Sequence, residues 1–265
     1  MINDRNLPIG IFDSGMGGIS VLAEVIKLMP KERYIYYGDS ENAPYGIKSA
    51  EEVKKLCTNI CDFLIDKGVK AIVVACNTAT SVAINDLRKE YDIPIIGMEP
   101  ALKPAATLGL DGKIVVMATD MTLKEKKLRE LMDRYGKHKE IIKQPCPKLV
   151  NLVESGIMKG KDVEIIIEEC FNGIKVDEIS SIVLGCTHYV FLKDQIRAFV
   201  GDKVPIIDGN EGTARHLKSI LEHRDLLKST KEEEVLLDVY NSKREEKIIE
   251  LSKNLLIFSL EKLGF

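Results

Sequence analysis

The sequence predicts an α/β protein made of two pseudo-symmetric, doubly wound domains, with mostly parallel sheets that face each other across a cleft. Short runs of β-branched and other apolar residues alternate with longer stretches of helical periodicity along the 265 residues. The short runs are apolar throughout, which is typical of parallel strands covered on both faces.

An internal repeat supports the division into two domains. Residues 71–78 read AIVVACNT and residues 181–188 read SIVLGCTH. Each is a strand-like run followed by a small residue, a cysteine and two polar residues. A weaker match relates PIGIFDS at 8–14 to KIVVMAT at 113–119. We interpret the repeat as two related α/β units.

Eight runs have strand character, and nine helical stretches lie between and after them. The expected strands are 8–12, 34–37, 71–75, 94–97, 113–118, 181–184, 205–207 and 235–240. The expected helices lie near 18–28, 49–66, 79–90, 101–108, 122–135, 161–172, 190–199, 211–221 and 244–257.

The composition narrows the class of function. Apolar residues make up 45% and charged residues 30% of the chain, which indicates a globular protein. A net charge of −3 gives no basic field for nucleic acid. No apolar run approaches the roughly 20 residues that cross a bilayer, and the start MINDRNLP has no export signal. We therefore expect no nucleic-acid or membrane partner.

The six cysteines are not arranged as a disulfide framework. They are spread along the chain and form no CxxC pair. Cys57 and Cys61 are four residues apart in a helical pattern, so we expect both to face the core. Free thiols in a reducing cytoplasm are the simplest interpretation.

A polar, glycine-rich turn follows the first expected strand. Asp13 and Ser14 precede Gly15, Gly17 and Gly18 at the start of a helix. Ligands of open α/β sheets bind outside the carboxyl ends of the strands, and backbone N–H groups at a helix start suit a carboxylate or phosphate. The turn has neither the Walker sequence nor the dinucleotide spacing. Its Asp can accept from an ammonium group and its Ser can donate to a carboxylate.

The two repeated cysteines suggest acid–base chemistry. Cys76 precedes Asn77 and Thr78, and Cys186 precedes Thr187 and His188, each pair at a strand-to-helix turn. Helical N–H dipoles favour a thiolate there. A single active thiol would indicate acyl transfer, and adjacent thiols would indicate redox chemistry. Thiols on opposite sides of a substrate would instead suit racemisation, in which one removes the α-proton and the other donates a new one.

Six motifs occur in the order found in a known family. They are GIFDSGMGGISVL (10–22), YYGDSENAPYG (36–46), VVACNTATS (73–81), GMEP (97–100), LVNLVESG (149–156) and VLGCTHY (183–189). Together they resemble the glutamate racemases of the cofactor-independent aspartate/glutamate racemase superfamily, from about residue 9 to residue 213. The resemblance implies an isomerase that uses no cofactor or metal and supplies D-glutamate for peptidoglycan.

The resemblance also assigns roles to residues. Cys76 would serve D-glutamate and Cys186 L-glutamate, while Asp13, Glu154 and His188 would assist the thiols or hold the ammonium group. The substrate-binding residues would be Asp13, Ser14, Pro44, Tyr45, Gly46, Asn77, Thr78, Thr122, Thr187 and His188. The first domain would comprise 1–98 and 209–265, and the second 99–208. The family implies hinge closure over the substrate and a possible homodimer.

Three alternatives stay open at this point. An aspartate racemase is the nearest, although the GDSENAPYG and GMEP motifs favour glutamate. A hydrolase or transferase with one cysteine nucleophile would form a covalent acyl-enzyme. A non-catalytic amino-acid-binding module would bind its ligand without exchange of the α-hydrogen.

Overall fold

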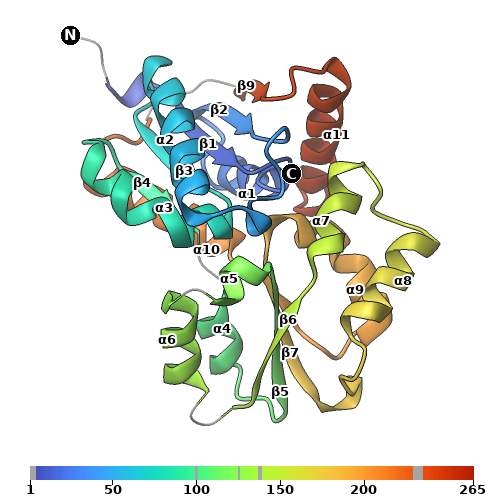
Figure 1. Cartoon of the computed structure of the whole chain (residues 1–265). Coiled ribbons are helices and arrows are strands. Elements are labelled where there is room, and N and C mark those ends of the chain that lie inside the picture. Colours follow the sequence, from blue (N-terminus) through green and yellow to red (C-terminus); the bar gives the residue numbers. More distant parts are fainter. Residues whose placement is uncertain (1–3, 99–100, 125, 137–138, 229–234) are drawn as a thin grey trace. The chain divides into compact units, whose positions relative to one another are not determined.

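The chain folds into two compact units, each built around a parallel sheet. The computed structural model describes residues 4–98, 101–124, 126–136, 139–228 and 235–265, so Glu99 and Pro100 of the GMEP motif lie outside the described residues. Unit 1 comprises Met1–Met98 and Asn210–Phe265, and unit 2 comprises Glu99–Gly209. Figure 1 labels the elements of both units.

Unit 1 has a sheet of five parallel strands in the order β4-β3-β1-β2-β9. These strands are β1 (Ile9–Asp13), β2 (Arg33–Gly38), β3 (Ala71–Val74), β4 (Ile95–Gly97) and β9 (Leu236–Asn241). Its helices are α1 (Ile19–Leu28), α2 (Ala50–Asp66), α3 (Asn77–Glu90), α10 (Asn210–His223) and α11 (Glu246–Lys262), with the short 3-10 helices η1 (Asp4–Asn6) and η2 (Tyr45–Ile47).

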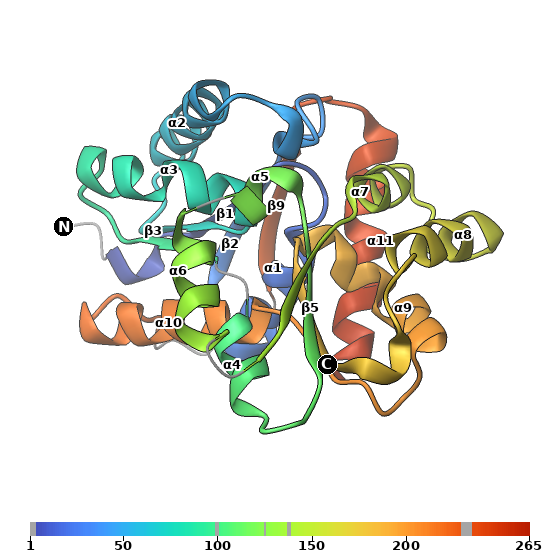
Figure 2. The same ribbon diagram turned by 60° about the horizontal axis from the view of Figure 1, so that its bottom comes forward.

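Helices cover both faces of this sheet, which explains why its central strands are apolar throughout. Helix α2 packs on α3, and α1 packs on α10 and α11. The two groups lie on opposite faces of the sheet (Figures 1 and 2). A side chain at Gly10 of β1 would meet Leu64 of α2 at 3.1 Å, so glycine permits their close approach. Helix α2 begins with a capping box formed by Ser49 and Glu52.

Unit 2 has a sheet of four parallel strands in the order β6-β5-β7-β8. The strands are β5 (Lys113–Ala118), β6 (Ile141–Pro145), β7 (Ile179–Gly185) and β8 (Ile206–Ile207). Its helices are α4 (Leu102–Thr107), α5 (Asp120–Lys124), α6 (Lys126–Tyr135), α7 (Pro147–Glu154), α8 (Lys161–Cys170) and α9 (Lys193–Val200), with η3 (Val176–Glu178) and η4 (Thr187–Leu192). Figure 2 shows α4 and α6 on one face of β5 and α8 and α9 on the other.

The two sheets share one strand order, which gives the sequence repeat a structural counterpart. Reading across each sheet, the second strand of the unit lies beside the first, followed by the third and the fourth. The strand β9 extends the sheet of unit 1 beyond β2. Cys76 follows the third strand of unit 1 and Cys186 follows the third strand of unit 2. The prediction of an α/β fold with parallel sheets is confirmed.

The sequence-based assignment missed one strand and one helix, both in unit 2. β6 is half-buried or exposed along its length, so it lacks the continuous apolar run that marks a covered strand. Helix α7 has eight residues and begins at Pro147, which made the segment resemble a loop. The expected helix 122–135 consists of two helices, α5 and α6, and the stretch 190–199 divides between η4 and α9.

All six cysteines are free and buried. Cys57 and Cys61 are both fully buried on the inner face of α2, as their spacing predicts.

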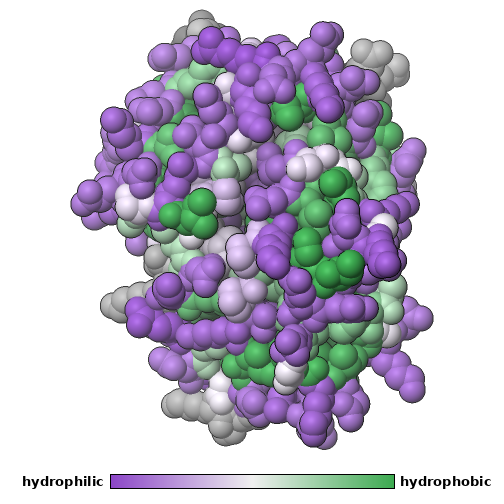
Figure 3. Space-filling view, turned by 45° about the vertical axis from the view of Figure 1, so that its right-hand side comes forward, coloured by the Kyte–Doolittle hydropathy of each residue, from purple (hydrophilic) through white to green (hydrophobic). Residues whose placement is uncertain are grey.

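The side of the molecule in Figure 3 is mainly hydrophilic, with separate hydrophobic patches. Within the described ranges, no helix has the length and apolarity that a bilayer span requires.

Candidate active site

In unit 1, Asp13 and Cys76 emerge from neighbouring strands at the carboxyl edge of the sheet. Phe12 pairs with Val74, and the Ala75 N–H donates to the Phe12 carbonyl at 2.8 Å. Asp13 is fully buried and accepts from the Gly15 N–H at 3.2 Å. A side chain at Gly18 would come within 2.6 Å of the Asp13 Cβ, so the glycine turn closes tightly around this carboxylate.

Cys76 occupies the N-cap position of α3. Its Sγ accepts from the Ala79 N–H at 3.4 Å, and only 6% of the residue is exposed. The helix N-terminus carries partial positive charge, which stabilises a negative sulfur at this place. The sequence therefore folds so that one thiol caps a helix of 14 residues.

The next residue, Asn77, has a buried side-chain amide without a hydrogen-bond partner. Neither its nitrogen nor its oxygen is bonded within the described part of the chain. An unsatisfied buried polar group costs about 1–3 kcal/mol. A polar ligand beside Cys76 would satisfy this amide, which agrees with the expected binding role. Ser14 and Thr78 are also buried at this edge.

Tyr45 belongs to the same unit as Cys76, and its hydroxyl is bonded to an acidic residue. Its hydroxyl donates to Asp39 Oδ2 at 2.6 Å, and the ring is buried. Burial and the nearby Asp39 raise the pKa of Tyr45 above its usual 10, with smaller contributions from Cys57 and Cys76. Tyr45 therefore stays a neutral phenol near Cys76. Pro44 and Gly46, which the resemblance also assigns to substrate binding, flank Tyr45 and are half-buried.

In unit 2, Cys186, His188 and Glu154 form a linked row. Cys186 Sγ lies 3.8 Å from His188 Nδ1, and His188 Nε2 donates to Glu154 Oε1 at 2.6 Å. Burial disfavours the imidazolium and lowers its pKa, but the bonds with Cys186 and Glu154 outweigh it, so the pKa of His188 stands well above 6.5. The row places a positive imidazolium beside the thiol.

Three threonine residues lie at the same sheet edge as the thiol of unit 2. Cys186 follows Gly185, which pairs with Ala118, so Thr119 emerges beside it. The Thr119 hydroxyl donates to the Thr122 Oγ1 at 3.0 Å, and both residues are buried. Thr187 Oγ1 lies 3.5 Å from His188 Nδ1. The structure thus brings Thr122, Thr187, His188 and Cys186 to one sheet edge.

Three other cysteines are held as protonated thiols. Burial raises the pKa of Cys57 well above its usual value and raises that of Cys61 to about 12. A hydrogen bond with Cys170, together with burial, raises the pKa of Cys146. These thiols are therefore poor bases near neutral pH.

We expect the Glu154→Gln variant to lower the pKa of His188. The amide keeps a hydrogen-bond acceptor but removes the negative charge that favours the imidazolium. NMR titration of the imidazole resonances measures this shift, and the alkaline limb of the activity profile should move to lower pH with it. Glu169→Gln, in an exposed ion pair with Lys148, is the control. An unchanged pKa of His188 would contradict the assigned interaction between Glu154 and His188.

Sequence reasoning did not single out Asp39. Its position directly after strand β2, within the GDSENAPYG motif, was the available signal, because polar residues at strand ends gather at one edge. The bond to Tyr45 could not be foreseen from the chain alone.

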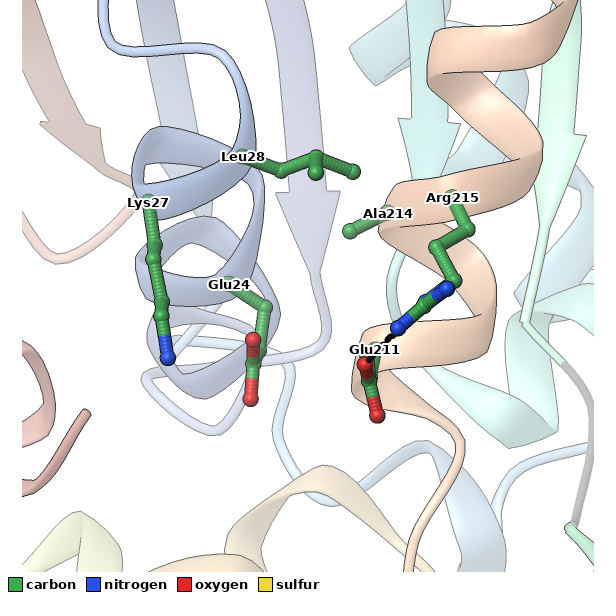
Figure 4. Close-up of a pocket in the computed structure, with 6 residues that line it drawn as sticks. All are labelled: Glu24, Lys27, Leu28, Glu211, Ala214 and Arg215. Atoms are coloured by element: carbon green, nitrogen blue, oxygen red, sulfur yellow. Dashed lines mark hydrogen bonds and ion pairs between the residues drawn. The ribbon is translucent and has the colours of Figure 1, made fainter.

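Three surface grooves of unit 1 contain none of the expected site residues. One, of about 360 Å³, lies between α1 and α10. Figure 4 shows its charged lining, in which Arg215 is paired with Glu211 on its own helix. A second, of about 500 Å³, adjoins Asp39 and the turn after β9, and a third, of about 520 Å³, lies beside β4. The strand-end residues of each unit remain the candidate half-sites.

Each half-site presents one thiol beside groups that can bind an amino acid. Carboxylate, amide and phenol groups accompany the thiol of unit 1. An imidazolium–carboxylate pair and threonine hydroxyls accompany that of unit 2. Among the described residues, no three His, Cys, Asp or Glu side chains gather as metal ligands. The groups present are suited to proton transfer.

The family model and the related sequences indicate the same protein family. The family model described as Asp/Glu/Hydantoin racemase matches residues 15–217. A glutamate racemase of Clostridium perfringens (strain ATCC 13124) is 54% identical over 253 residues, which cover 95% of this chain and 97% of the relative.

Solved structures agree with the sequence comparison. The glutamate racemase of Francisella tularensis in complex with D-glutamate matches with a TM-score of 0.81 and 30% identity, covering 95% of this chain and 94% of that one. The Escherichia coli glutamate racemase in complex with L-glutamate and its activator UDP-MurNAc-ala matches with a TM-score of 0.84 and 27% identity, covering 96% and 95%.

Proposed function

Since the chain belongs to the Asp/Glu racemase family, among its glutamate racemases, we propose that Cys76 and Cys186 transfer the α-proton of glutamate. The chain is an amino-acid racemase. The observation that carries the two-thiol assignment is the recurrence of a cysteine after the third strand of each unit, with ionisable partners beside it. A single-nucleophile hydrolase needs no such duplication.

The reaction is a balanced exchange of protons. The thiolate of one cysteine forms an S–H bond with the α-proton, and the electron pair of the broken C–H bond remains on Cα. The thiol of the other cysteine then delivers its proton to the opposite face of Cα and becomes a thiolate. The roles reverse in the other direction, so two thiols of similar acidity suit a reversible reaction.

The half-sites supply different support for their thiols. The N-terminus of α3 stabilises the Cys76 thiolate, and Asp13 offers a carboxylate for the ammonium group. His188, fixed by Glu154, offers an imidazolium whose Nδ1 lies 3.8 Å from the Sγ of Cys186. We assign Cys76 to D-glutamate and Cys186 to L-glutamate.

The remaining residues bind the polar groups of the substrate. Ser14, Asn77, Thr78, Thr122 and Thr187 offer hydroxyl and amide groups, and Pro44, Tyr45 and Gly46 form a wall. The unsatisfied amide of Asn77 gives the strongest support for such a role. The α-proton is weakly acidic, so the carbanion requires preorganised donors and exclusion of water.

A comparison of two substrates and one trapping experiment tests the proposal. Purified protein is incubated with L-glutamate or L-aspartate, without pyridoxal phosphate, and the enantiomers are separated by chiral chromatography. We expect D-glutamate to form much faster than D-aspartate. Faster formation of D-aspartate would indicate an aspartate racemase. An acyl-enzyme adduct in the mass spectrum would instead indicate a cysteine-nucleophile enzyme.

The product suggests the cellular role. We propose that the enzyme acts in the cytoplasm, where its six free cysteines stay reduced, and supplies D-glutamate for peptidoglycan. Its partner in this role is the small-molecule substrate, L- or D-glutamate. We retain a homodimer as the proposed assembly.

A further inference from the structure

The turn after β9 is bonded to the loop that follows β2, although about 200 residues separate them in the sequence. The Asn241 side chain donates from Nδ2 to Ser40 Oγ at 3.0 Å. The Glu41 N–H donates to Ser242 Oγ at 2.9 Å. The Ser242 N–H donates to the Gly38 carbonyl at 3.0 Å. The turn 241–244 therefore holds the loop 38–44 by three separate bonds.

Asn241 serves both the turn and the loop. Its Oδ1 accepts from the Lys243 N–H at 3.0 Å, while its Nδ2 reaches Ser40. The residue is buried, so both polar atoms of its side chain are satisfied within the fold. Replacing this amide would loosen the turn and release the loop together.

The same contact reaches the glycine turn that carries Asp13 and Ser14. A Cβ at Gly38 would lie 2.7 Å from the Gly15 carbonyl oxygen and 2.9 Å from Asn241 Nδ2, so these two groups approach each other across Gly38. The Asp39 N–H also donates to the Asp13 carbonyl at 3.0 Å. The loop is thus a bridge between the C-terminal turn and the aspartate end of the half-site.

Further hydrogen bonds link the loop to Tyr45. Asp39 Oδ2 accepts from the Tyr45 hydroxyl at 2.6 Å, and Oδ1 accepts from Asn42 Nδ2 at 3.0 Å. The position of Asp39 therefore fixes the phenol near Cys76. A shift of the loop would move this phenol together with Pro44.

The outer side of the loop is open to solvent. Asp39, Glu41 and Asn42 line an open groove of about 500 Å³, and Ser242, Lys243 and Arg244 line it from the turn. Within the loop, Asp39 and Ser40 are buried, whereas Glu41 is exposed. The hydrogen bonds from Ser242 to Glu41 and Gly38 therefore constrain this solvent-facing part of the loop from the side of the turn.

We propose that Asn241 and Ser242 are positioning residues for glutamate, acting through the loop 38–44 on Pro44 and Tyr45. This inference rests on the proposed function, because it assigns Pro44 and Tyr45 to the substrate wall. The bonds of these two residues run to the loop and within their own turn, so we assign them an indirect role. They set the shape of the pocket from the C-terminal segment of the chain.

The expected signature is a change in KM with little change in kcat. Ser242→Ala removes the acceptor for the Glu41 N–H, and Asn241→Ala removes the donor to Ser40. Each variant loses one side-chain hydrogen bond to the loop and should raise KM about three- to tenfold for both enantiomers, the range of one such bond. The value of kcat should stay within about twofold, because Cys76 is held by α3 rather than by the loop. Ser242→Thr keeps the hydroxyl and should restore the wild-type KM.

The matched control is Ser259→Ala, in the same C-terminal segment. The Ser259 hydroxyl donates to the Leu255 carbonyl at 2.8 Å within α11, away from the loop. A merely structural role of Asn241 or Ser242 would lower the melting temperature and the yield of active enzyme without moving KM, as in this control. A change in KM below twofold in both loop variants would overturn the inference.

A second readout does not depend on catalysis. Amide hydrogen exchange over residues 39–47, followed by mass spectrometry, should be about tenfold faster in Asn241→Ala and Ser242→Ala than in the wild type. Absence of glutamate racemisation by the wild type would count against the proposed function, while faster exchange would still support the constraint on the loop. Unchanged exchange would overturn the inference even in an active racemase.

Discussion

Replacing either Cys76 or Cys186 by alanine is expected to lower glutamate racemisation about a thousandfold or more in both directions. Each direction uses both sulfurs, one to remove the α-proton and the other to deliver a proton to the opposite face. Loss of one group therefore slows both reactions, since positioned acid–base groups contribute about 10²–10⁴-fold each. Serine variants should fail as well, because a hydroxyl is a far weaker acid than a thiol.

The measurement is the rate of formation of each enantiomer by chiral chromatography, with circular dichroism as the check on folding. Cys61→Ala is the control, since Cys61 is also buried in unit 1 but lies within α2 and not at a strand end. It should keep near wild-type activity. A Cys76→Ala or Cys186→Ala protein that is folded and retains a tenth of wild-type activity would contradict the assignment.

The second large effect concerns stability rather than chemistry. Lys70 and Glu32 form an ion pair at 2.5 Å, and each side chain is only 1% exposed. Lys70 Nζ also donates to the carbonyls of Arg5 and Leu226, and Glu32 Oε1 accepts from the Lys228 N–H. The pair ties the start of the chain and the segment after α10 to the sheet of unit 1.

We expect Lys70→Met to lower the free energy of unfolding by about 3–5 kcal/mol, because it leaves the Glu32 carboxylate buried without its cation. Urea unfolding followed by circular dichroism measures the loss. The double variant Lys70→Met with Glu32→Leu should recover part of it, since no buried charge remains.

The matched control for this stability effect is Lys54→Met. Lys54 pairs with Asp86 at 2.7 Å, but both side chains are about half exposed, so its loss should leave stability essentially unchanged. Equal effects of the two Lys→Met variants would contradict the importance given to burial.

Strand ends were the most predictable part of the fold. β1, β3, β5 and β7 are covered on both faces, so their sequences are continuous apolar runs and the polar residues that follow them are easily recognised. Cys76 and Cys186 could be proposed from this placement and from the repeat. The edge strand β6 lacks that signal because it is only partly covered.

Other parts of the candidate site depend on contacts that local sequence does not encode. Glu154 ends the unrecognised helix α7, and its role as partner of His188 came only from the family resemblance. The bonds of Asn241 and Ser242 to the loop 38–44 join positions about 200 residues apart. A single sequence carries no periodicity that pairs such distant positions.

The distribution of deuterium at early conversion is the most direct test of two thiols acting on opposite faces of one carbon. Each pure enantiomer of glutamate is incubated with the enzyme in heavy water, and both enantiomers are analysed by mass spectrometry before equilibrium. If the assignment is right, the product carries solvent deuterium at Cα while the unconverted starting enantiomer stays unlabelled, in both directions. Product that keeps the original hydrogen, or equal labelling of both enantiomers, would show that a single base serves both faces.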